Sequence, residues 1–212
     1  MKHAYFRFYA ELNDFLPAAK RQVLFDYPFE LSRSVKDMIE SLGIPHTEVD
    51  LILVSNSQFP DRAVESRSVD FSYQVQDGDE ISVYPVFESI DITSLARVRP
   101  KPLREVRFIL DTHLGKLALY LRMLGFDTFY RNNYTDEELA RISNTEGRIL
   151  LTKDRGLLKR NEVTHGHYVR ETDPQRQIIE ILQHFDLADA VRPFRRCLRC
   201  NTLLQPVAKQ AI

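Results

Sequence analysis

The sequence has few of the features that build cross-linked or membrane-embedded proteins. It holds only two cysteines among 212 residues, which cannot form the disulfide framework of a small secreted domain. No apolar run approaches the roughly 20 residues that a transmembrane helix needs. The formal net charge is −1, so no global field marks a nucleic-acid-binding protein, although a local basic patch stays open.

The N-terminal segment MKHAYFRFYAEL lacks the apolar core of a signal peptide and alternates as a strand does. We therefore expect a cytoplasmic protein without a membrane partner. The composition is 43% hydrophobic and 28% charged, which is enough apolar material for a real core. The length suggests one or two domains.

The first 88 residues predict a small α+β domain. Alternating apolar residues indicate strands at 3–10 and 22–29, and Ser34 can cap a helix that ends near Gly43. Further strands are expected at 51–54 and 80–86, with a short one at 58–59. The order strand, strand, helix, strand, strand is typical of a β-grasp domain. No Gly-Gly pair occurs, which argues against sulfur-carrier chemistry and favours an adaptor or packing domain, which could bind a protein partner.

Residues 89–104 read as a linker, because Pro100 and Pro102 break any helix. This segment and its border carry a basic run: Arg97, Arg99, Lys101, Arg104 and Arg107. A solvated linker is the favoured interpretation, and contact with a phosphate backbone is the alternative.

Residues 105–190 predict an α/β domain with a mainly parallel sheet. The apolar run 106–110 is followed by a helical pattern at 114–124, and Gly125 stands where a helix end often needs a left-handed residue. Strands are expected at 126–130, 148–152 and 167–170. Helices are expected after Thr135, which forms a capping box with Glu138, and after Asp173.

Three aspartates occupy related positions in this domain. Asp111 and Asp154 each follow an apolar strand, and Asp136 opens the helix after another strand, so all three are expected at one edge of the sheet. Converging carboxylates repel one another and are normally tolerated around a hard cation such as Mg²⁺ or Mn²⁺. The alternative is that each carboxylate only caps a helix, which is the favoured interpretation for Asp173.

The sequences around these acids resemble the Mut-seven C-terminal RNase family, a group of PIN-like nucleases. The resemblance rests on FILDTHLGKLALYLRMLGFDT, TDEELARIS and GRILLTKDRGLLKR, and DGDEISVYPVFESIDIT is similar to the ubiquitin-like domain often fused in front. It implies a PIN-like α/β/α fold and metal-dependent hydrolysis of RNA. By matching position it assigns Asp111, Asp136 and Asp154 as catalytic, metal-binding acids, with Glu137 as a less certain fourth.

The segment RCLRCNTLL, within residues 191–212, resembles the start of that family's zinc ribbon. Cys197 and Cys200 would supply two thiolates, and the second C-x-x-C of a ribbon is absent from this sequence. We therefore expect an incomplete zinc-ribbon segment that binds Zn²⁺ only if ligands from beyond this chain complete it. Two reduced surface cysteines are the favoured alternative.

Arginines around the cysteines could contact an RNA backbone: Arg192, Arg195, Arg196 and Arg199. Tyr130, Tyr134 and Phe194 could stack on bases, but core packing is the favoured interpretation for each. His113 and Lys116 could touch phosphate. The resulting hypothesis is a metal-dependent ribonuclease. The alternatives are a non-catalytic RNA-binding or adaptor module and, less favoured, a sulfur-carrier-like protein.

Overall fold

The computed structural model describes residues 1–56, 66–85, 97–98 and 105–205. The chain divides into two compact units, Met1–Lys101 and Pro102–Ile212, which are described separately. Most of the predicted linker and the predicted strand at 58–59 lie outside the described residues. Among the described residues, no helix is long and apolar enough to cross a membrane.

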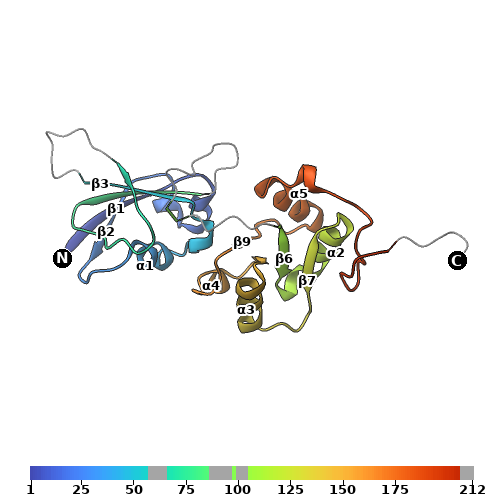
Figure 1. Cartoon of the computed structure of the whole chain (residues 1–212). Coiled ribbons are helices and arrows are strands. Elements are labelled where there is room, and N and C mark those ends of the chain that lie inside the picture. The colour runs from blue at the N-terminus through green and yellow to red at the C-terminus, as the bar shows by residue number, and fades with distance from the viewer. Residues whose placement is uncertain (57–65, 86–96, 99–104, 206–212) are drawn as a thin grey trace, which may run out of the picture. The chain divides into compact units, whose positions relative to one another are not determined.

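The first unit is a five-stranded mixed sheet in the order β2-β1-β5-β3-β4. The sheet pairs β1 with β5 in parallel and its other neighbours antiparallel. Figure 1 shows the helix on one face of this sheet. The regular elements are β1 (Lys2–Phe8), β2 (Phe25–Phe29), α1 (Val35–Ser41), β3 (Leu51–Asn56), β4 (Arg67–Ser68) and β5 (Asp79–Tyr84), with 3-10 turns at Ala10–Phe15, Ala18–Lys20 and His46–Glu48.

This arrangement confirms the predicted β-grasp fold and part of its local detail. The Ser34 side chain caps α1 by accepting the backbone N–H of Asp37. Inward residues of β1 alternate with exposed ones, so Ala4, Phe6 and Phe8 are buried. The turns between Ala10 and Lys20 and the two-residue strand β4 were not predicted.

The second unit is a four-stranded, wholly parallel sheet in the order β7-β6-β8-β9. This confirms the predicted α/β domain of PIN-like type. Its regular elements are β6 (Arg107–Leu110), α2 (Gly115–Met123), β7 (Asp127–Tyr130), α3 (Asp136–Glu146), β8 (Ile149–Thr152), α4 (Arg155–Leu158), β9 (Gly166–Tyr168) and α5 (Pro174–His184), with 3-10 turns at Thr112–Leu114 and Ala188–Ala190.

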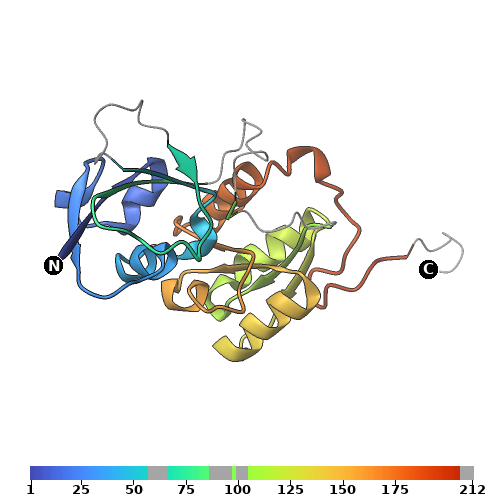
Figure 2. The same cartoon turned by 60° about the vertical axis from the view of Figure 1, so that its left-hand side comes forward.

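Helices cover both faces of this sheet, because successive side chains of a strand point to opposite faces. Phe108 and Leu110 pack in one core with α2 and α5, whereas Ile109 packs in the other with α3 and α4. Figures 1 and 2 show the helices on the two faces of this sheet from two directions. The predicted capping box of Thr135 and Glu138 is present at the start of α3.

The turn after α2 is fixed by a close approach of the C-terminal segment. Gly125 has φ +97°, and a Cβ at this position would collide with the carbonyl oxygen of Arg192. The Arg192 N–H donates to the carbonyl of Leu124 at 2.9 Å. The segment after α5 is therefore packed directly on the end of α2.

We expect Gly125→Ala to lower the free energy of unfolding by at least ~2 kcal/mol, because it adds a backbone clash to left-handed strain. Gly43→Ala is the matched control, since Gly43 has the same φ of +97° but its Cβ would lie 3.6 Å from the nearest atom. The control should lose about 1 kcal/mol. Calorimetric unfolding of the two variants measures the difference, and equal losses would contradict the close approach.

Candidate active site

The parallel register brings two of the predicted acids to one edge of the second sheet. Leu110 of β6 is the Cα partner of Leu151 of β8, so the residues that follow both strands emerge at the same level. Asp111 follows β6 directly, and its N–H donates to the Leu151 carbonyl at 3.1 Å. Asp154 comes two residues after the end of β8. The predicted placement of both residues at the carboxyl edge is therefore correct.

A buried hydroxyl joins the two acidic segments. Thr152 is fully buried, and its Oγ1 donates to Oδ2 of Asp111 at 2.7 Å. The same oxygen accepts the backbone N–H of Asp154 at 2.9 Å. Thr152 therefore fixes the Asp111 carboxylate relative to the Asp154 backbone. Thr152 was not among the predicted site residues, although its position at the strand end, two residues before an aspartate, was visible in the sequence.

Both aspartates also cap the turns that follow them. Oδ1 of Asp111 accepts the N–H of Thr112 at 2.5 Å. Oδ1 of Asp154 accepts the N–H groups of Gly156 at 2.6 Å and Leu157 at 3.3 Å. The alternative interpretation, that these carboxylates cap helices, is thus correct for the local structure. It does not exclude a ligand role, because an ionised carboxylate has about four lone-pair sites on its two oxygens.

Asp136 is the first residue of α3, and its side chain is exposed. Partial burial raises the pKa of its carboxyl, and the negative charges of Asp154, Asp111 and Glu137 raise it further, while Arg160 opposes the shift. Like charges act in this way only over short distances. The electrostatics therefore relate all three predicted acids to one region of the sheet edge.

Glu137 faces a different partner from the three aspartates. Its carboxylate forms an ion pair with Arg160 at 3.1 Å. A hydrogen bond to its own backbone N–H, and then the Arg160 pair, lower the pKa of Glu137. Its predicted role as a fourth ligand would require it to leave Arg160, and that role stays a prediction. Asp173 caps α5 by accepting the N–H groups of Gln175 and Arg176, as the favoured interpretation expected.

The donor set suits a hard divalent cation in chemistry, since carboxylate oxygens are the ligands that Mg²⁺ and Mn²⁺ prefer. In the part of the chain that the structure describes, no group of three or more His, Cys, Asp or Glu side chains is arranged to hold a metal ion. The three aspartates therefore share an edge without forming a ready cage.

The C-x-x-C turn lies at the other end of the sheet, beside the start of β7. Arg122 of α2 donates to the carbonyls of Leu198 at 2.9 Å and Arg199 at 3.0 Å. Its Nε donates to the carbonyl of Thr128 at 2.9 Å, and Asn201 Oδ1 accepts the Thr128 N–H at 3.0 Å. Side chains thus satisfy both main-chain polar groups of Thr128 on the edge strand.

Cys197 and Cys200 are both reduced. Hydrogen bonds from the side chain and then the backbone of Thr202, together with Cys197, lower the pKa of Cys200 to about 7. The turn is closed by bonds between the N–H of Cys197 and the Thr202 carbonyl at 2.8 Å, and between the N–H of Asn201 and the Cys197 carbonyl at 2.9 Å. Two thiolates held in such a turn suit half of a tetrahedral zinc site.

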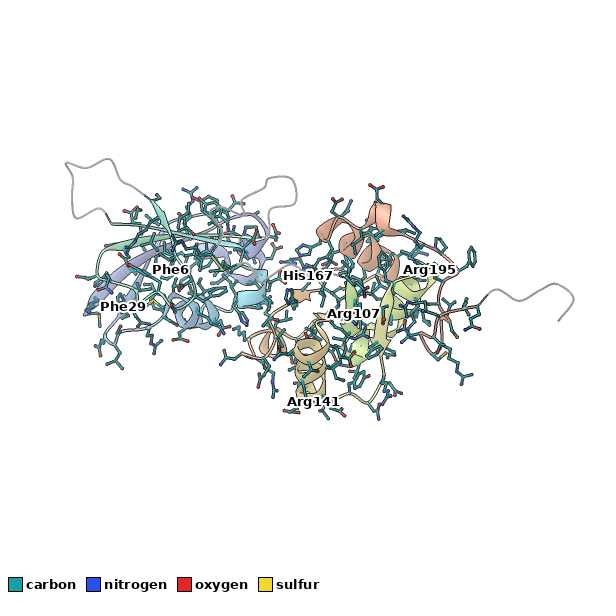
Figure 3. The ribbon with its side chains drawn as sticks, viewed as in Figure 1. Phe6, Phe29, Arg107, Arg141, His167 and Arg195 are labelled. Carbon is teal, nitrogen blue, oxygen red and sulfur yellow. The ribbon has the colours of Figure 1, made fainter. Side chains whose placement is uncertain are left out.

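The four predicted RNA-binding arginines occupy unlike positions on this C-terminal segment. Arg196 is directed inward, where it pairs with Asp127 at 3.3 Å and donates to the Asn201 carbonyl at 3.0 Å. Arg192 donates to backbone carbonyls of its own turn. Arg195 and Arg199 are exposed, and Figure 3 marks Arg195. The inward bonds of Arg196 argue against its predicted RNA contact.

The predicted aromatic residues also divide. Tyr130 and Tyr134 are half-buried against the two cores, as the core-packing interpretation expected. That interpretation is wrong for Phe194, which is 89% exposed. His113 and Lys116 are exposed in the turn and helix after Asp111.

Comparison with known proteins agrees with this architecture. The family model described as the Mut7-C RNAse domain matches residues 106–212. The model described as Mut7-C ubiquitin matches residues 1–91. Neither the curated proteins nor the solved structures gave a match to the chain.

We expect Thr152→Val to lower the free energy of unfolding by about 1–3 kcal/mol, because it removes the hydroxyl that serves Asp111 and the Asp154 N–H without changing the side chain's size much. Thr152→Ser, which keeps the hydroxyl, should lose less. Denaturant unfolding compares the two variants. If valine proves as stable as threonine, the hydroxyl does not hold this edge together.

The opposite pKa shifts of two neighbouring acids predict opposite effects of neutralising them. Because the folded pKa of Asp136 is raised, its charge opposes folding above that pKa, and Asp136→Asn should raise Tm at neutral pH by about 1–3 °C. Because the pKa of Glu137 is lowered, its charge favours folding above the unfolded value, and Glu137→Gln should lower Tm.

Both differences should fade as the pH falls below about 4, where the unfolded carboxyls are protonated. Thermal unfolding of wild type and both variants in metal-free buffer, at several pH values, checks the signs. A lower Tm for Asp136→Asn at neutral pH would refute the proposed repulsion among the three aspartates.

Proposed function

The chain belongs to the family of Mut7-C RNAse domains, and on this premise we propose that it is a metal-dependent ribonuclease that hydrolyses RNA phosphodiester bonds at the carboxyl edge of its second sheet. The RNase-domain match itself indicates a nuclease-type function. The observation that carries the finer proposal is the meeting of Asp111 and the Asp154 segment at Thr152. Partial burial, and after it the charges of Asp154 and Asp111, raise the pKa of Asp136.

In this proposal Asp111, Asp136 and Asp154 hold Mg²⁺ or Mn²⁺. The bound cation would supply an activated water and would stabilise the charge that develops on the leaving oxygen. Asp111 is the rigid member of the set, since it is 9% exposed and its two oxygens are held by Thr112 and Thr152. Fixed carboxylates cost little reorganisation when a charged ligand binds.

Asp136 and Asp154 are the accessible members. Both side chains are exposed. Asp154 is held by two backbone N–H groups at the start of α4, which orient one of its oxygens. One oxygen of Asp154 thus has a structural role, and this anchoring orients the other.

The remaining assignments extend the same proposal. Glu137 would join the cation site only after release from Arg160. Cys197 and Cys200 would bind Zn²⁺ with two further ligands from beyond these 212 residues, which contain no other cysteine. For the first unit we propose binding of a protein partner, because the chain holds no Gly-Gly pair for sulfur-carrier chemistry.

A second candidate function is RNA binding without turnover. The exposed side chains of Arg195 and Arg199, and the complete local capping roles of Asp111 and Asp154, favour it. Such a module would bind RNA with a strong salt dependence and would show no cleavage stimulated by Mn²⁺.

We expect Asp111→Asn and Asp154→Asn each to lower RNA cleavage by at least about 100-fold, because each removes a negative ligand while asparagine keeps the cap. Cleavage of a labelled single-stranded RNA with and without Mg²⁺ or Mn²⁺ measures the effect. Asp37→Asn is the control, since Asp37 lies in the first turn of α1 as Asp136 does in α3.

The control should cleave as wild type does. Metal-stimulated cleavage that survives in both site variants would refute the acidic site. Binding of RNA by the wild type without any cleavage would favour the second candidate function.

A further inference from the structure

We propose that the outer edge of β7 is a track for single-stranded RNA, which runs from the C-x-x-C turn at one end of the strand to the acidic edge at the other. Arg131, which lies over the Tyr134 ring, would hold the RNA beside the acids, and Arg195 with Arg199 would hold it at the far end. This inference rests on the proposed ribonuclease function, because it takes the acidic edge as the place of cleavage.

The acid end of the track follows from the register of β6 and β7. Leu110 is the Cα partner of Tyr130, so Arg131 follows β7 at the level at which Asp111 follows β6. The Tyr130 hydroxyl donates to the Thr112 carbonyl at 2.8 Å, which ties the end of β7 to the turn after Asp111. Neighbouring strands lie about 4.8 Å apart, so Arg131 emerges close to Asp111.

Gly115 permits this junction. A Cβ on Gly115 would lie 2.7 Å from the Tyr130 hydroxyl oxygen, so the tyrosine packs directly on the start of α2. The exposed Lys116 directly follows Gly115 in the sequence.

Arg131 and Tyr134 form a cation-π pair in the loop between β7 and α3. The Arg131 guanidinium carbon lies 5.7 Å from the centre of the Tyr134 ring. Tyr134 is anchored against the core of α3 and α4, whereas Arg131 is exposed. A guanidinium held over an aromatic ring offers donors to a phosphate and a face on which a base can stack.

The far end of the track is fastened to the start of β7 by Arg122 and Asn201. Four residues of strand span only about 13 Å, so the exposed Arg199 and the acidic edge lie a few nucleotides apart. The Arg122 side chain that makes these bonds is buried.

The charge and bonding of this edge favour RNA over a peptide strand. Asp127, which opens β7, is matched by Arg148 at 2.8 Å and Arg196 at 3.3 Å, so it does not leave an uncompensated charge that repels phosphate. The N–H and carbonyl of Thr128 are already bonded to Asn201 and Arg122. A peptide could not pair with these groups, whereas RNA needs only the arginine and tyrosine side chains.

The test measures binding of single-stranded oligoribonucleotides of increasing length, from a dinucleotide upward, to the full chain by fluorescence anisotropy. All proteins carry Asp154→Asn, so the RNA stays intact. We expect Arg131→Ala to weaken binding at every length by roughly five-fold or more, and to lower the slope of log affinity against log salt by about 0.7 per lost phosphate contact.

The double variant Arg195→Ala/Arg199→Ala should weaken binding only of oligomers long enough to reach the C-x-x-C turn. Arg141→Ala is the control, because Arg141 is an exposed arginine of α3, marked in Figure 3, and should change neither affinity nor slope. Tyr134→Phe should bind as the parent does, since it keeps the aromatic face, whereas Tyr134→Leu should weaken binding as Arg131→Ala does.

Equal losses for Arg141→Ala and Arg131→Ala, or an effect of the double variant that does not depend on RNA length, would overturn the track. Duplex RNA that binds as tightly as single strands would also overturn it. Failure of the proposed function looks different: the wild-type chain would show these length and salt signatures but no metal-stimulated cleavage. Cleavage with an unchanged KM in Arg131→Ala would sink the track and leave the ribonuclease standing.

Discussion

One buried hydroxyl sets the geometry on which the candidate site depends. Thr152 ends β8 and holds both an oxygen of Asp111 and the backbone N–H of Asp154. Carboxylates that share an edge repel one another, and this repulsion adds to partial burial in raising the pKa of Asp136. In the folded chain, the repulsion is opposed by the parallel register of β6 and β8 and by the hydrogen bonds of Thr152. The Asp111 carboxylate and the Asp154 segment are therefore held together before any cation is bound, although the three aspartates form no ready cage among the described residues.

The opposite end of the sheet is fixed by a second set of bonds that span far longer sequence distances. Arg122 and Asn201 place the C-x-x-C turn on the start of β7, and Gly125 allows the preceding segment to cross the end of α2. These bonds cover part of an edge strand that would otherwise expose its backbone. They also give the unit exposed arginines at one end of β7 and acids at the other. That polarity suits a chain-like anionic substrate.

The sequence predicted the parts of this structure that depend on local pattern. These parts are properties of neighbouring residues: apolar periodicity, the caps at Ser34 and Thr135, and Gly125 at a helix end. The structure confirms each of them. The ends of the predicted strands likewise indicated Asp111 and Asp154 as candidate site residues. The bonds of Thr152 and Arg122 depend on strand order and on contacts dozens of residues apart, which periodicity does not encode.

The outward Phe194 and inward Arg196 show the same limit, because residue type alone favours the reverse.

The central claim is that Asp111, Asp136 and Asp154 share one divalent cation. Anomalous X-ray scattering from a crystal soaked in Mn²⁺ tests it most directly. The account predicts one peak at the carboxyl edge, about 2.0–2.6 Å from oxygens of these aspartates. No peak there at saturating Mn²⁺, or a peak bound only by other residues, would contradict it.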